Sequence, residues 1–583
     1  MGSSRSLLDR VRAGVIGRDA VRVGPYGARR VTYADYTATG RALDLVENAI
    51  TRDVLPWYAN THTESSTTGR RTTRLREQAR EAVRDGVGGS AETAVIFCGS
   101  GATGAIDRFI TLLGLHGPAR GSAPDPRRPI VFVGPYEHHS NEIGWRESTA
   151  EVVTIPFDDR GGICADGLER ALVRHADRPF KIGSFSAASN VTGVMSDTAA
   201  ISRLLHTHDA LACWDFAAAG PYVDIAMAPR CGHDPDERFD AVFLSPHKMI
   251  GGPGSPGVLA VRRALLDNPT PAVPGGGTVR YVSPWGHDFL DDVEHREEGG
   301  TPDIIGSIRA GMAFRLKQAI GVDTIAATET RHLRAALDRW REHPRLELLG
   351  PTAGHRLPIL SFRIRSPRGG HLHHNLVVAM LDDLFGIQSR GGCSCAGPYG
   401  HELLGIDRAT SRALRQAVAT GRADGLKMGW TRVALSYLLS DAEADFVARA
   451  IGLIADDGWK LITDYRFDPA TGCWTHRRAP CEPAADLGAL VLGDHPPGEC
   501  DHWWAEDPLA DQTLAQYLED ADRLLWSLPD DQRPMTPATV SPTFDALRWF
   551  DLPAACLRSQ PATGRAMPIE HRHRTRPQTV PST

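Results

Sequence analysis

The stretch "FLSPHKMIGGPGSPG", residues 243–257, joins a short apolar run to a loop that is rich in glycine and proline. It places one lysine, Lys248, directly after a Ser-Pro-His tripeptide. Lysine is rarely buried, because removing its ammonium group from water costs free energy. A lysine held in so rigid a segment therefore indicates a site where chemistry needs an amine.

Short apolar runs bounded by Gly, Pro, Ser or Asp recur along the first half of the chain, between about residues 60 and 270. They occupy residues 93–99, 129–135, 151–157, 181–189, 210–217, 241–247 and 257–263. Helical periodicity with a charged face appears at 68–87, 304–320, 326–341 and 440–455. Strands that alternate with helices predict an α/β domain with a mainly parallel sheet. In such a sheet the reactive residues lie just beyond the carboxyl ends of the strands.

The rest of the chain has a different texture. Between about 280 and 455 it is mixed, with strand-like segments at 357–365 and 430–439, which indicates a second, α+β domain. Beyond 456 it becomes rich in tryptophan and contains an acidic helical stretch at 509–528. The last residues, 571–583, are polar and basic, as is typical of a disordered tail.

Composition narrows the class of protein. The chain has 583 residues, of which 42% are hydrophobic and 23% charged, and this predicts two or three globular domains. Its 65 basic and 71 acidic residues are intermixed, so neither nucleic acid nor an anionic membrane is the expected partner. We find no apolar run of the roughly 20 residues that span a bilayer, and the ten cysteines are scattered. We therefore expect a cytoplasmic protein that acts on a small molecule or a protein.

Three strand-end segments carry candidate site residues. The first, "GSGATGAID" at 99–107, opens a helix, and its backbone N–H groups are suited to an anion such as phosphate. The second is "CWDFAAAGPY" at 213–222, in which Asp215 is placed either to hold a proton on a heterocyclic nitrogen or to cap a helix. The third is "YEHHSNE" at 136–142, in which His138 and His139 suit ring stacking, metal binding or a structural role. Taken with Lys248, these features describe pyridoxal phosphate bound to a lysine as a Schiff base, with an aspartate on its ring nitrogen.

Several motifs also carry a resemblance to a known family. They are "YADYTATG" (33–40), "YANTHTESSTTGR" (58–70), "SGATGAID" (100–107), "EHHSN" (137–141), "SNVTG" (189–193), "WDFAA" (214–218), "SPHK" (245–248), "GGGT" (275–278) and "EGGTPD" (298–303). Through them the chain resembles the class V fold-type I pyridoxal-phosphate enzymes, most closely the cysteine desulfurase and selenocysteine lyase group. The resemblance implies a large domain with a mainly parallel seven-stranded sheet, a smaller α+β domain and a C-terminal extension. It also implies a homodimer.

The resemblance places domain boundaries and cofactor residues. The expected parts are an N-terminal segment that packs with the small domain (1–55), the large domain (56–272), the small domain with a cysteine loop (273–455), an extension of unknown role (456–570) and the tail (571–583). The residues it implies around pyridoxal phosphate are Ala102, Thr103, Ser245 and His247 at the phosphate, His138 stacked on the ring, Asn190 near the phenolic oxygen, Asp215 on the ring nitrogen, Lys248 as the Schiff base and Thr278 from the neighbouring subunit.

The substrate end rests on two further segments, "QSRGGCSCAGPYG" (388–400) and "GWTRVALSYLLSDAEAD" (429–445). The first resembles the desulfurase loop with the nucleophilic cysteine, which implies that role for Cys395 and places Arg390 just upstream. The second implies that Arg432 holds the substrate carboxylate, as a bidentate guanidinium can. In that reaction Lys248 removes the α-proton to give a quinonoid, and Cys395 takes the sulfur of L-cysteine, or of a related amino acid, as a persulfide. Cys393 is the second candidate for this thiol, and we expect no metal at this pair.

Some positions depart from the family pattern. Ala218 stands where the family usually has glutamine, Gly104 stands where it has an acidic residue, and 400–428 is an insertion. These departures leave other reactions of class V open, namely those of an aminotransferase, an epimerase or a β-eliminating lyase, none of which needs the cysteines. A protein of another class, a scaffold or docking protein without catalysis, also remains open. For a desulfurase, a sulfur-acceptor protein is an expected partner.

Overall fold

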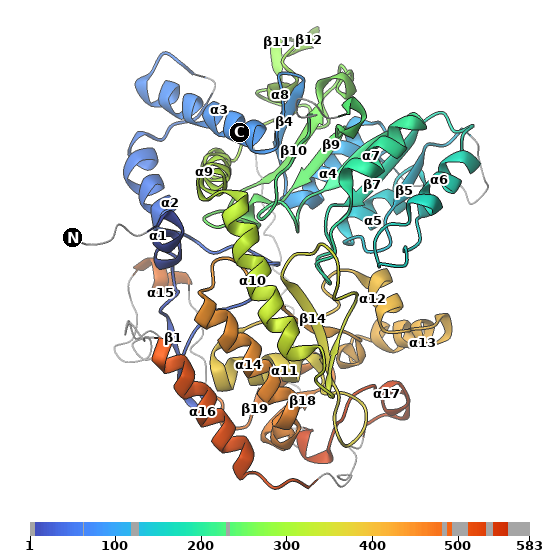
Figure 1. Cartoon of the computed structure of the whole chain (residues 1–583). Coiled ribbons are helices and arrows are strands. Elements are labelled where there is room, and N and C mark those ends of the chain that lie inside the picture. Colours follow the sequence, from blue (N-terminus) through green and yellow to red (C-terminus); the bar gives the residue numbers. More distant parts are fainter. Residues whose placement is uncertain are drawn as a thin grey trace, which may run out of the picture.

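The computed structural model describes residues 6–61, 63–117, 127–228, 234–480, 487–492, 511–531 and 540–557. Two sheets organise the chain, a large one in the upper part of Figure 1 and a smaller one in the lower part. The tail expected at 571–583 lies outside the described residues. None of the helices in the described ranges is both long enough and apolar enough to cross a bilayer.

The large sheet has seven strands in the order β4-β10-β9-β8-β7-β5-β6. Strand β10 is antiparallel to both its neighbours, and the other neighbouring pairs are parallel. Each apolar run predicted from the sequence forms one strand, so the mainly parallel seven-stranded sheet is confirmed. The strands are β4 (Thr93–Cys98), β5 (Ile130–Val133), β6 (Glu151–Thr154), β7 (Lys181–Ser186), β8 (Ala210–Asp215), β9 (Ala241–Leu244) and β10 (Gly257–Arg262).

Helices cover both faces of this sheet, which explains why its strands are apolar along their whole length. In β4, Val95 and Phe97 face one core while Ala94, Ile96 and Cys98 face the other. The first core includes side chains of α3 (Thr67–Gly86), α6 (Ala165–Arg174), α7 (Thr198–Thr207) and α9 (Ile304–Ile320). The second includes side chains of α4 (Gly101–Leu112) and α5 (Ser140–Arg146).

The smaller sheet is antiparallel, with the strand order β13-β14-β17-β16. Its strands are β13 (Leu346–Leu348), β14 (Ile359–Ile364), β16 (Arg390–Gly392) and β17 (Trp430–Ala434). The nearby helices are α10 (Val322–Trp340), α11 (His374–Phe385), α12 (Gly397–Leu403), α13 (Arg408–Ala419) and α14 (Asp441–Asp457). Strand β16 leads into the cysteine loop, so this sheet fixes where that loop begins.

The N-terminal segment packs against the smaller sheet's helices. Arg18 and Arg30 both form ion pairs with Glu443 of α14, and β3 pairs in parallel with β15. The elements of this region and its partner strand are α1 (Leu7–Ala13), β1 (Val21–Gly24), β2 (Gly27–Arg30), β3 (Thr32–Tyr33), α2 (Asp44–Ala49) and β15 (Ile387–Gln388).

The described part of the C-terminal extension lies on the same lower half (Figure 1). Tyr517 and Phe550 are buried in the main core, and the Tyr517 hydroxyl accepts a hydrogen bond from the Arg30 backbone N–H at 3.2 Å. The extension therefore shares a core with the small domain. Its elements are β18 (Tyr465–Asp468), β19 (Cys473–His476), α15 (Leu487–Leu492), α16 (Asp511–Ser527) and α17 (Pro542–Leu547).

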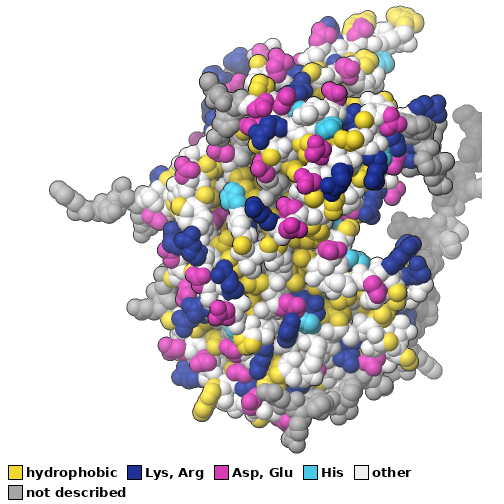
Figure 2. Space-filling view, turned by 45° about the vertical axis from the view of Figure 1, so that its right-hand side comes forward, with side chains coloured by type: hydrophobic (Ala, Val, Ile, Leu, Met, Phe, Trp, Pro, Cys, Tyr) yellow, Lys and Arg dark blue, Asp and Glu magenta, His cyan; other side chains and the backbone are white. Residues whose placement is uncertain are grey.

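One hairpin projects from the upper part of the molecule in Figure 1. It consists of β11 (Val279–Ser283) and β12 (Gly286–Phe289), and α8 (Val293–Arg296) follows it. Its Tyr281, Val282 and Trp285 side chains are strongly exposed. Elsewhere on the face drawn in Figure 2, basic and acidic side chains are interspersed, as the composition led us to expect.

Candidate active site

A cavity of about 260 Å³ lies at the carboxyl ends of the large sheet's parallel strands. Most of the predicted site residues line it, namely Ala102, Thr103, His138, Asn190, Asp215, Ser245, His247, Lys248, Arg390, Cys395 and Arg432. They converge because β4, β5, β7, β8 and β9 all end at this edge of the sheet. Cys393 and Thr278 are not among the lining residues.

One wall of the cavity is the N-terminus of α4. The Ala102 backbone N–H donates to Ser245 Oγ at 2.8 Å, and the Thr103 and Ser140 hydroxyls lie 2.6 Å apart. Gly101 has a φ of +57°, and a Cβ there would lie 2.8 Å from Ser245 Oγ. The glycine thus keeps open a pocket of N–H and O–H groups that suits an anion.

The departure at Gly104 has a steric reason. A Cβ at this position would lie 2.9 Å from the Gly99 Cα and 3.2 Å from the Cys98 carbonyl oxygen. The two backbone segments approach too closely for any side chain. The acidic residue of the family pattern could therefore enter here only if the turn moved.

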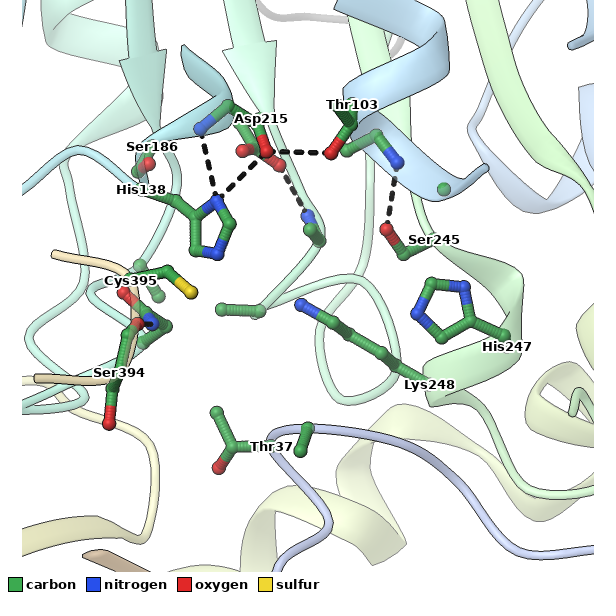
Figure 3. A pocket seen from close by; sticks show the side chains of 18 of the residues that line it. Thr37, Thr103, His138, Ser186, Asp215, Ser245, His247, Lys248, Ser394 and Cys395 are labelled. Carbon is green, nitrogen blue, oxygen red and sulfur yellow. Dashed lines mark hydrogen bonds between the residues drawn. The ribbon is translucent and has the colours of Figure 1, made fainter. Parts of the chain in front are cut away.

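Asp215 and Lys248 lie in the same cavity (Figure 3). Asp215, the last residue of β8, is buried, and its Oδ1 accepts a hydrogen bond from the Ala217 N–H at 2.8 Å. Burial raises the pKa of Asp215, and that N–H and the Lys248 charge oppose the rise. Burial likewise lowers the pKa of the Lys248 amine, which the Asp215 carboxylate opposes. Each group therefore helps the other to stay ionised.

The histidines of this site are neutral near pH 7. Burial, helped by the charge of Lys248, lowers the pKa of His138 and that of His247 to about 4. His138 Nδ1 accepts a hydrogen bond from the Ser140 N–H at 3.2 Å, which fixes its ring. His139 instead contacts the cysteine loop. Its backbone N–H donates to the Cys395 carbonyl at 2.8 Å, and its ring Nε2 accepts from the Gly397 backbone N–H at 2.9 Å.

Two arginines and one carboxylate form another wall. Asp35 Oδ1 accepts from Arg432 Nη2 at 3.1 Å, and Oδ2 accepts from Arg390 Nε at 2.9 Å. Arg432 Nη1 also donates to the Asn190 carbonyl at 2.9 Å. Asp35 belongs to a motif that resembles the family, at 33–40, but the sequence predicted no role for it. The carboxylate in that segment was the only signal for it.

The cysteine loop is tightly held. The Asn190 side-chain amide donates to the Ser394 carbonyl at 2.7 Å, and both Ser394 and Cys395 have left-handed backbones, with φ of 53° and 56°. Figure 3 shows the Cys395 sulfur and the Lys248 amine pointing into the pocket from opposite sides. Both cysteines of the loop are exposed, but only Cys395 lines the cavity.

Thr278, which is expected to serve the cavity of a neighbouring subunit, lies outside the cavity of its own chain. The Thr278 hydroxyl is buried and bonds within its own turn, donating to the Gly275 carbonyl at 2.7 Å. The cavity also includes Ala218, noted above as a departure from the family pattern, and residues to which no role was assigned from the sequence, namely Thr37, Ala38, Ser100, Gly101, Ser140, Ser186, Ala188, Ala217 and Ser394. Among them, Ser186 is fixed by donating to the buried Glu137 at 2.6 Å.

The family model for "Aminotransferase class-V" matches residues 32–416, a span that includes almost the whole cavity. The chain belongs to the class-V aminotransferase family. Curated relatives of this class-V protein include a "Probable cysteine desulfurase" of Streptomyces coelicolor, 27% identical over 382 residues that cover 64% of this chain and 85% of the relative. A "Cysteine desulfurase" of Dickeya dadantii is 30% identical over 347 residues, covering 58% and 77%.

Solved structures show the same fold. An apo cysteine desulfurase from Thermococcus onnurineus superposes with a TM-score of 0.62 at 22% identity, over 78% of this chain and all of the other. An Escherichia coli cysteine desulfurase gives 0.59 at 20% identity, over 77% and 98%. Class-V aminotransferases use pyridoxal phosphate, so this class-V protein is an enzyme of that kind and falls in the desulfurase group. The predicted family is confirmed, and the scaffold alternative is set aside.

Proposed function

We propose that this class-V enzyme is a pyridoxal-phosphate-dependent desulfurase that takes the sulfur of L-cysteine, or of a related amino acid, onto Cys395 and releases alanine. The observation that supports it most is that Lys248, Asp215 and Cys395 line one cavity, with the thiol facing the amine (Figure 3). The names of the curated relatives agree with this activity.

The residues of the cavity suit pyridoxal phosphate. The opening above Gly101, which a Cβ would fill, has the N–H and O–H donors that a phosphate needs. Asp215 is a buried carboxylate placed for a ring nitrogen, Lys248 is an amine with a lowered pKa, and the neutral His138 offers a face for stacking. Bound there, the cofactor supplies an electron sink for the bonds at the substrate's Cα.

The remaining groups serve the substrate. Arg432 uses Nη2 and Nη1 for Asp35 and Asn190, and its other N–H groups suit the substrate carboxylate. Lys248 Nζ takes the proton from the substrate's Cα, a role that a lowered pKa favours near neutral pH. The Cys395 thiolate then attacks the substrate sulfur, and the carbon–sulfur bond breaks with its electrons left on carbon.

The deciding experiment compares the wild type with Cys395→Ala, both loaded with pyridoxal phosphate and given L-cysteine. We expect the wild type to release alanine and to carry a persulfide, and the variant to do neither while it keeps the visible absorbance of the lysine-bound cofactor. Cys473→Ala, a change at another exposed cysteine, is the matched control. If Cys395→Ala still releases sulfide at the wild-type rate, a β-eliminating lyase replaces the desulfurase; amino-group transfer or racemisation without sulfide would indicate the other class V reactions.

We also propose a homodimer in which the exposed glycines beside Thr278, Gly275 and Gly276, lie at the cavity of the other protomer, while Thr278 holds their turn from within. The exposed hairpin that begins directly after Thr278, with Tyr281 and Trp285, supports this as an apolar contact surface. Sedimentation of the wild type and of Trp285→Asp tests it: we expect a dimer that the charge weakens. A monomeric wild type would contradict it. A cytoplasmic location and a sulfur-acceptor protein stay predictions of the same proposal.

A further inference from the structure

Two exposed thiols lie on one short loop, and only one of them lines the cavity. We propose that Cys393 is a relay thiol, which takes the sulfur from Cys395 and presents it outside the cavity to an acceptor thiol. This inference rests on the proposed desulfurase function. It adds a second sulfur-carrying residue to the chain and a direction in which the sulfur moves.

The loop is anchored at both of the residues that follow Cys393. The Ser394 carbonyl accepts from the Asn190 amide at 2.7 Å, and the Cys395 carbonyl accepts from the His139 N–H at 2.8 Å. On the far side, the Gly397 N–H donates to His139 Nε2 at 2.9 Å. A loop tied at successive residues cannot carry Cys395 out to a partner unless these bonds break. The sulfur itself must therefore move.

The backbone brings the two cysteines close together. The Ala396 N–H donates to the Cys393 carbonyl at 3.1 Å, which closes a four-residue turn around Ser394 and Cys395. The two central residues, Ser394 and Cys395, have positive φ, as in a type I′ turn. This backbone conformation is unusual for residues other than glycine. Two residues apart, the Cα atoms can be separated by at most about 7 Å. That is within the range over which two cysteines can exchange sulfur.

The two thiols face different surroundings. Cys395 stands in the wall of the cavity of about 260 Å³ that it shares with Lys248, although its side chain is also exposed. Cys393 is exposed outside the cavity lining and lies directly after β16. A persulfide on Cys393 is therefore presented to a large thiol outside the cavity, whereas a large thiol that approaches one on Cys395 must come up to the cavity wall.

The transfer balances without an oxidant. The Cys393 thiolate attacks the outer sulfur of the Cys395 persulfide, the bond between that sulfur and Cys395 Sγ breaks, and Cys395 leaves as a thiolate. The new bond joins the outer sulfur to Cys393 Sγ, so one thiol and one persulfide remain. Attack on the inner sulfur would instead give a Cys393–Cys395 disulfide and hydrosulfide, which is a different reaction.

The test uses the full-length enzyme loaded with pyridoxal phosphate, L-cysteine and two acceptor thiols. One acceptor is dithiothreitol, which is small enough for the cavity, and the other is a thiol fixed directly on the surface of a cross-linked polymer bead, which is too large. In Cys393→Ser we expect sulfur transfer to the polymer to fall about tenfold or more, because the proximity of the relay is lost. Transfer to dithiothreitol should stay near the wild-type rate. Cys473→Ser, at an exposed cysteine of β19, should change neither rate.

Trapping shows where the sulfur lies. After a single turnover and alkylation, fragment mass spectrometry of the wild type should find the extra sulfur on Cys393, and that of Cys393→Ser should find it on Cys395 alone. Equal transfer to the polymer in Cys393→Ser and the wild type would overturn the relay, as would a Cys393–Cys395 disulfide as the product. A Cys395→Ser variant that still forms a persulfide on Cys393 would overturn it too. A wild type that forms no persulfide and no sulfide would defeat the proposed function, and the relay with it.

Discussion

Asp35 and Arg432 form a buried ion pair in which Arg432 Nη2 donates to Asp35 Oδ1 at 3.1 Å. The same carboxylate accepts from Arg390 Nε at 2.9 Å, so one side chain orients both arginines of the cavity. Burial lowers the pKa of Arg432, and Asp35 is the largest opposing influence. Asp35 is thus a positioning residue that keeps a buried cation charged before substrate arrives.

Replacing Asp35 should weaken both folding and substrate binding. In Asp35→Asn the buried Arg432 loses its counter-charge, and we expect the free energy of unfolding to drop by about 3 kcal/mol. We also expect a rise in KM for the amino acid that exceeds the fall in kcat, because the carboxylate-binding guanidinium loses its orientation. Urea unfolding and steady-state kinetics measure the two effects. Asp445→Asn, which breaks the exposed pair with Arg339, should cost under about 1 kcal/mol.

Lys248 should be the residue that becomes joined to pyridoxal phosphate. Borohydride reduction of the loaded enzyme, followed by peptide mapping, should place the cofactor's mass on Lys248 and on no other lysine. Lys248→Ala should lose both this label and turnover, because no other lysine lines the cavity within the described residues. Lys427→Ala, at an exposed lysine, is the control and should keep both. A label at another lysine would contradict the assignment.

The strand-end residues could be predicted because a parallel sheet brings the carboxyl ends of its strands to one edge. Asp215 at the end of β8 and Ser245 after β9 needed only the pattern of apolar runs. The partners of Asp35 could not be read in this way. Arg390 and Arg432 lie 355 and 397 positions further along the chain, and only tertiary packing joins them.

The extension was also beyond sequence reasoning. Its acidic helical stretch was predicted and forms α16, but the surface that it covers was not. Tyr517 contacts Arg29 and Arg30 near the N-terminus, contacts that a local pattern cannot reveal. The steric reason for Gly104 was hidden for a different reason: Gly99 is close to it in the sequence, but only the shape of the turn brings the two backbones together.

Asp215 should matter for chemistry more than for cofactor retention. In Asp215→Asn the carboxylate charge at the ring nitrogen is lost, and with it the electrostatic support for charge that develops during reaction. We expect kcat to fall about 10²-fold or more, while the lysine-bound cofactor still absorbs in the visible range. Turnover with L-cysteine and a cofactor titration separate the two quantities. Unchanged kcat in Asp215→Asn would assign it the alternative role of a turn-capping residue, through its bond to the Ala217 N–H.

Glu329 should make the protein less stable as the pH rises. This carboxyl is buried, its hydrogen-bond donor is the Tyr437 N–H, and burial raises its pKa from 4.5 to about 8. At pH values between 4.5 and about 8, the folded state holds a proton on Glu329 that the unfolded state has lost. The free energy of unfolding therefore falls as the pH rises through this range, in total by on the order of 4 kcal/mol. Glu329→Gln removes this contribution. Urea unfolding at several pH values should therefore give a flatter profile for the variant than for the wild type; parallel profiles would contradict the prediction.

Trp549 should hold the extension against the strand that carries the cysteine loop. Its ring stacks on His374 and His373, with ring centroids 5.6 and 5.4 Å away, and its Nε1 donates to the Leu426 carbonyl at 3.3 Å. His374 in turn lies beside Gly391 of β16, where an added Cβ would approach the His374 ring to 3.0 Å. A change at Trp549 should therefore reach the loop through this stack.

We expect Trp549→Ala to lower the free energy of unfolding by about 3 kcal/mol, because it removes a large packed ring and one of the two rings that stack on His374. Trp549→Phe keeps a ring but loses the hydrogen bond, and should cost about 1 kcal/mol. Trp526→Ala is the matched control, since that side chain lies on α16 of the same extension, is 85% exposed and should change stability little. Urea unfolding of the three variants orders them. If Trp549→Ala is as stable as Trp526→Ala, the Trp549 ring does not hold the extension against the small domain.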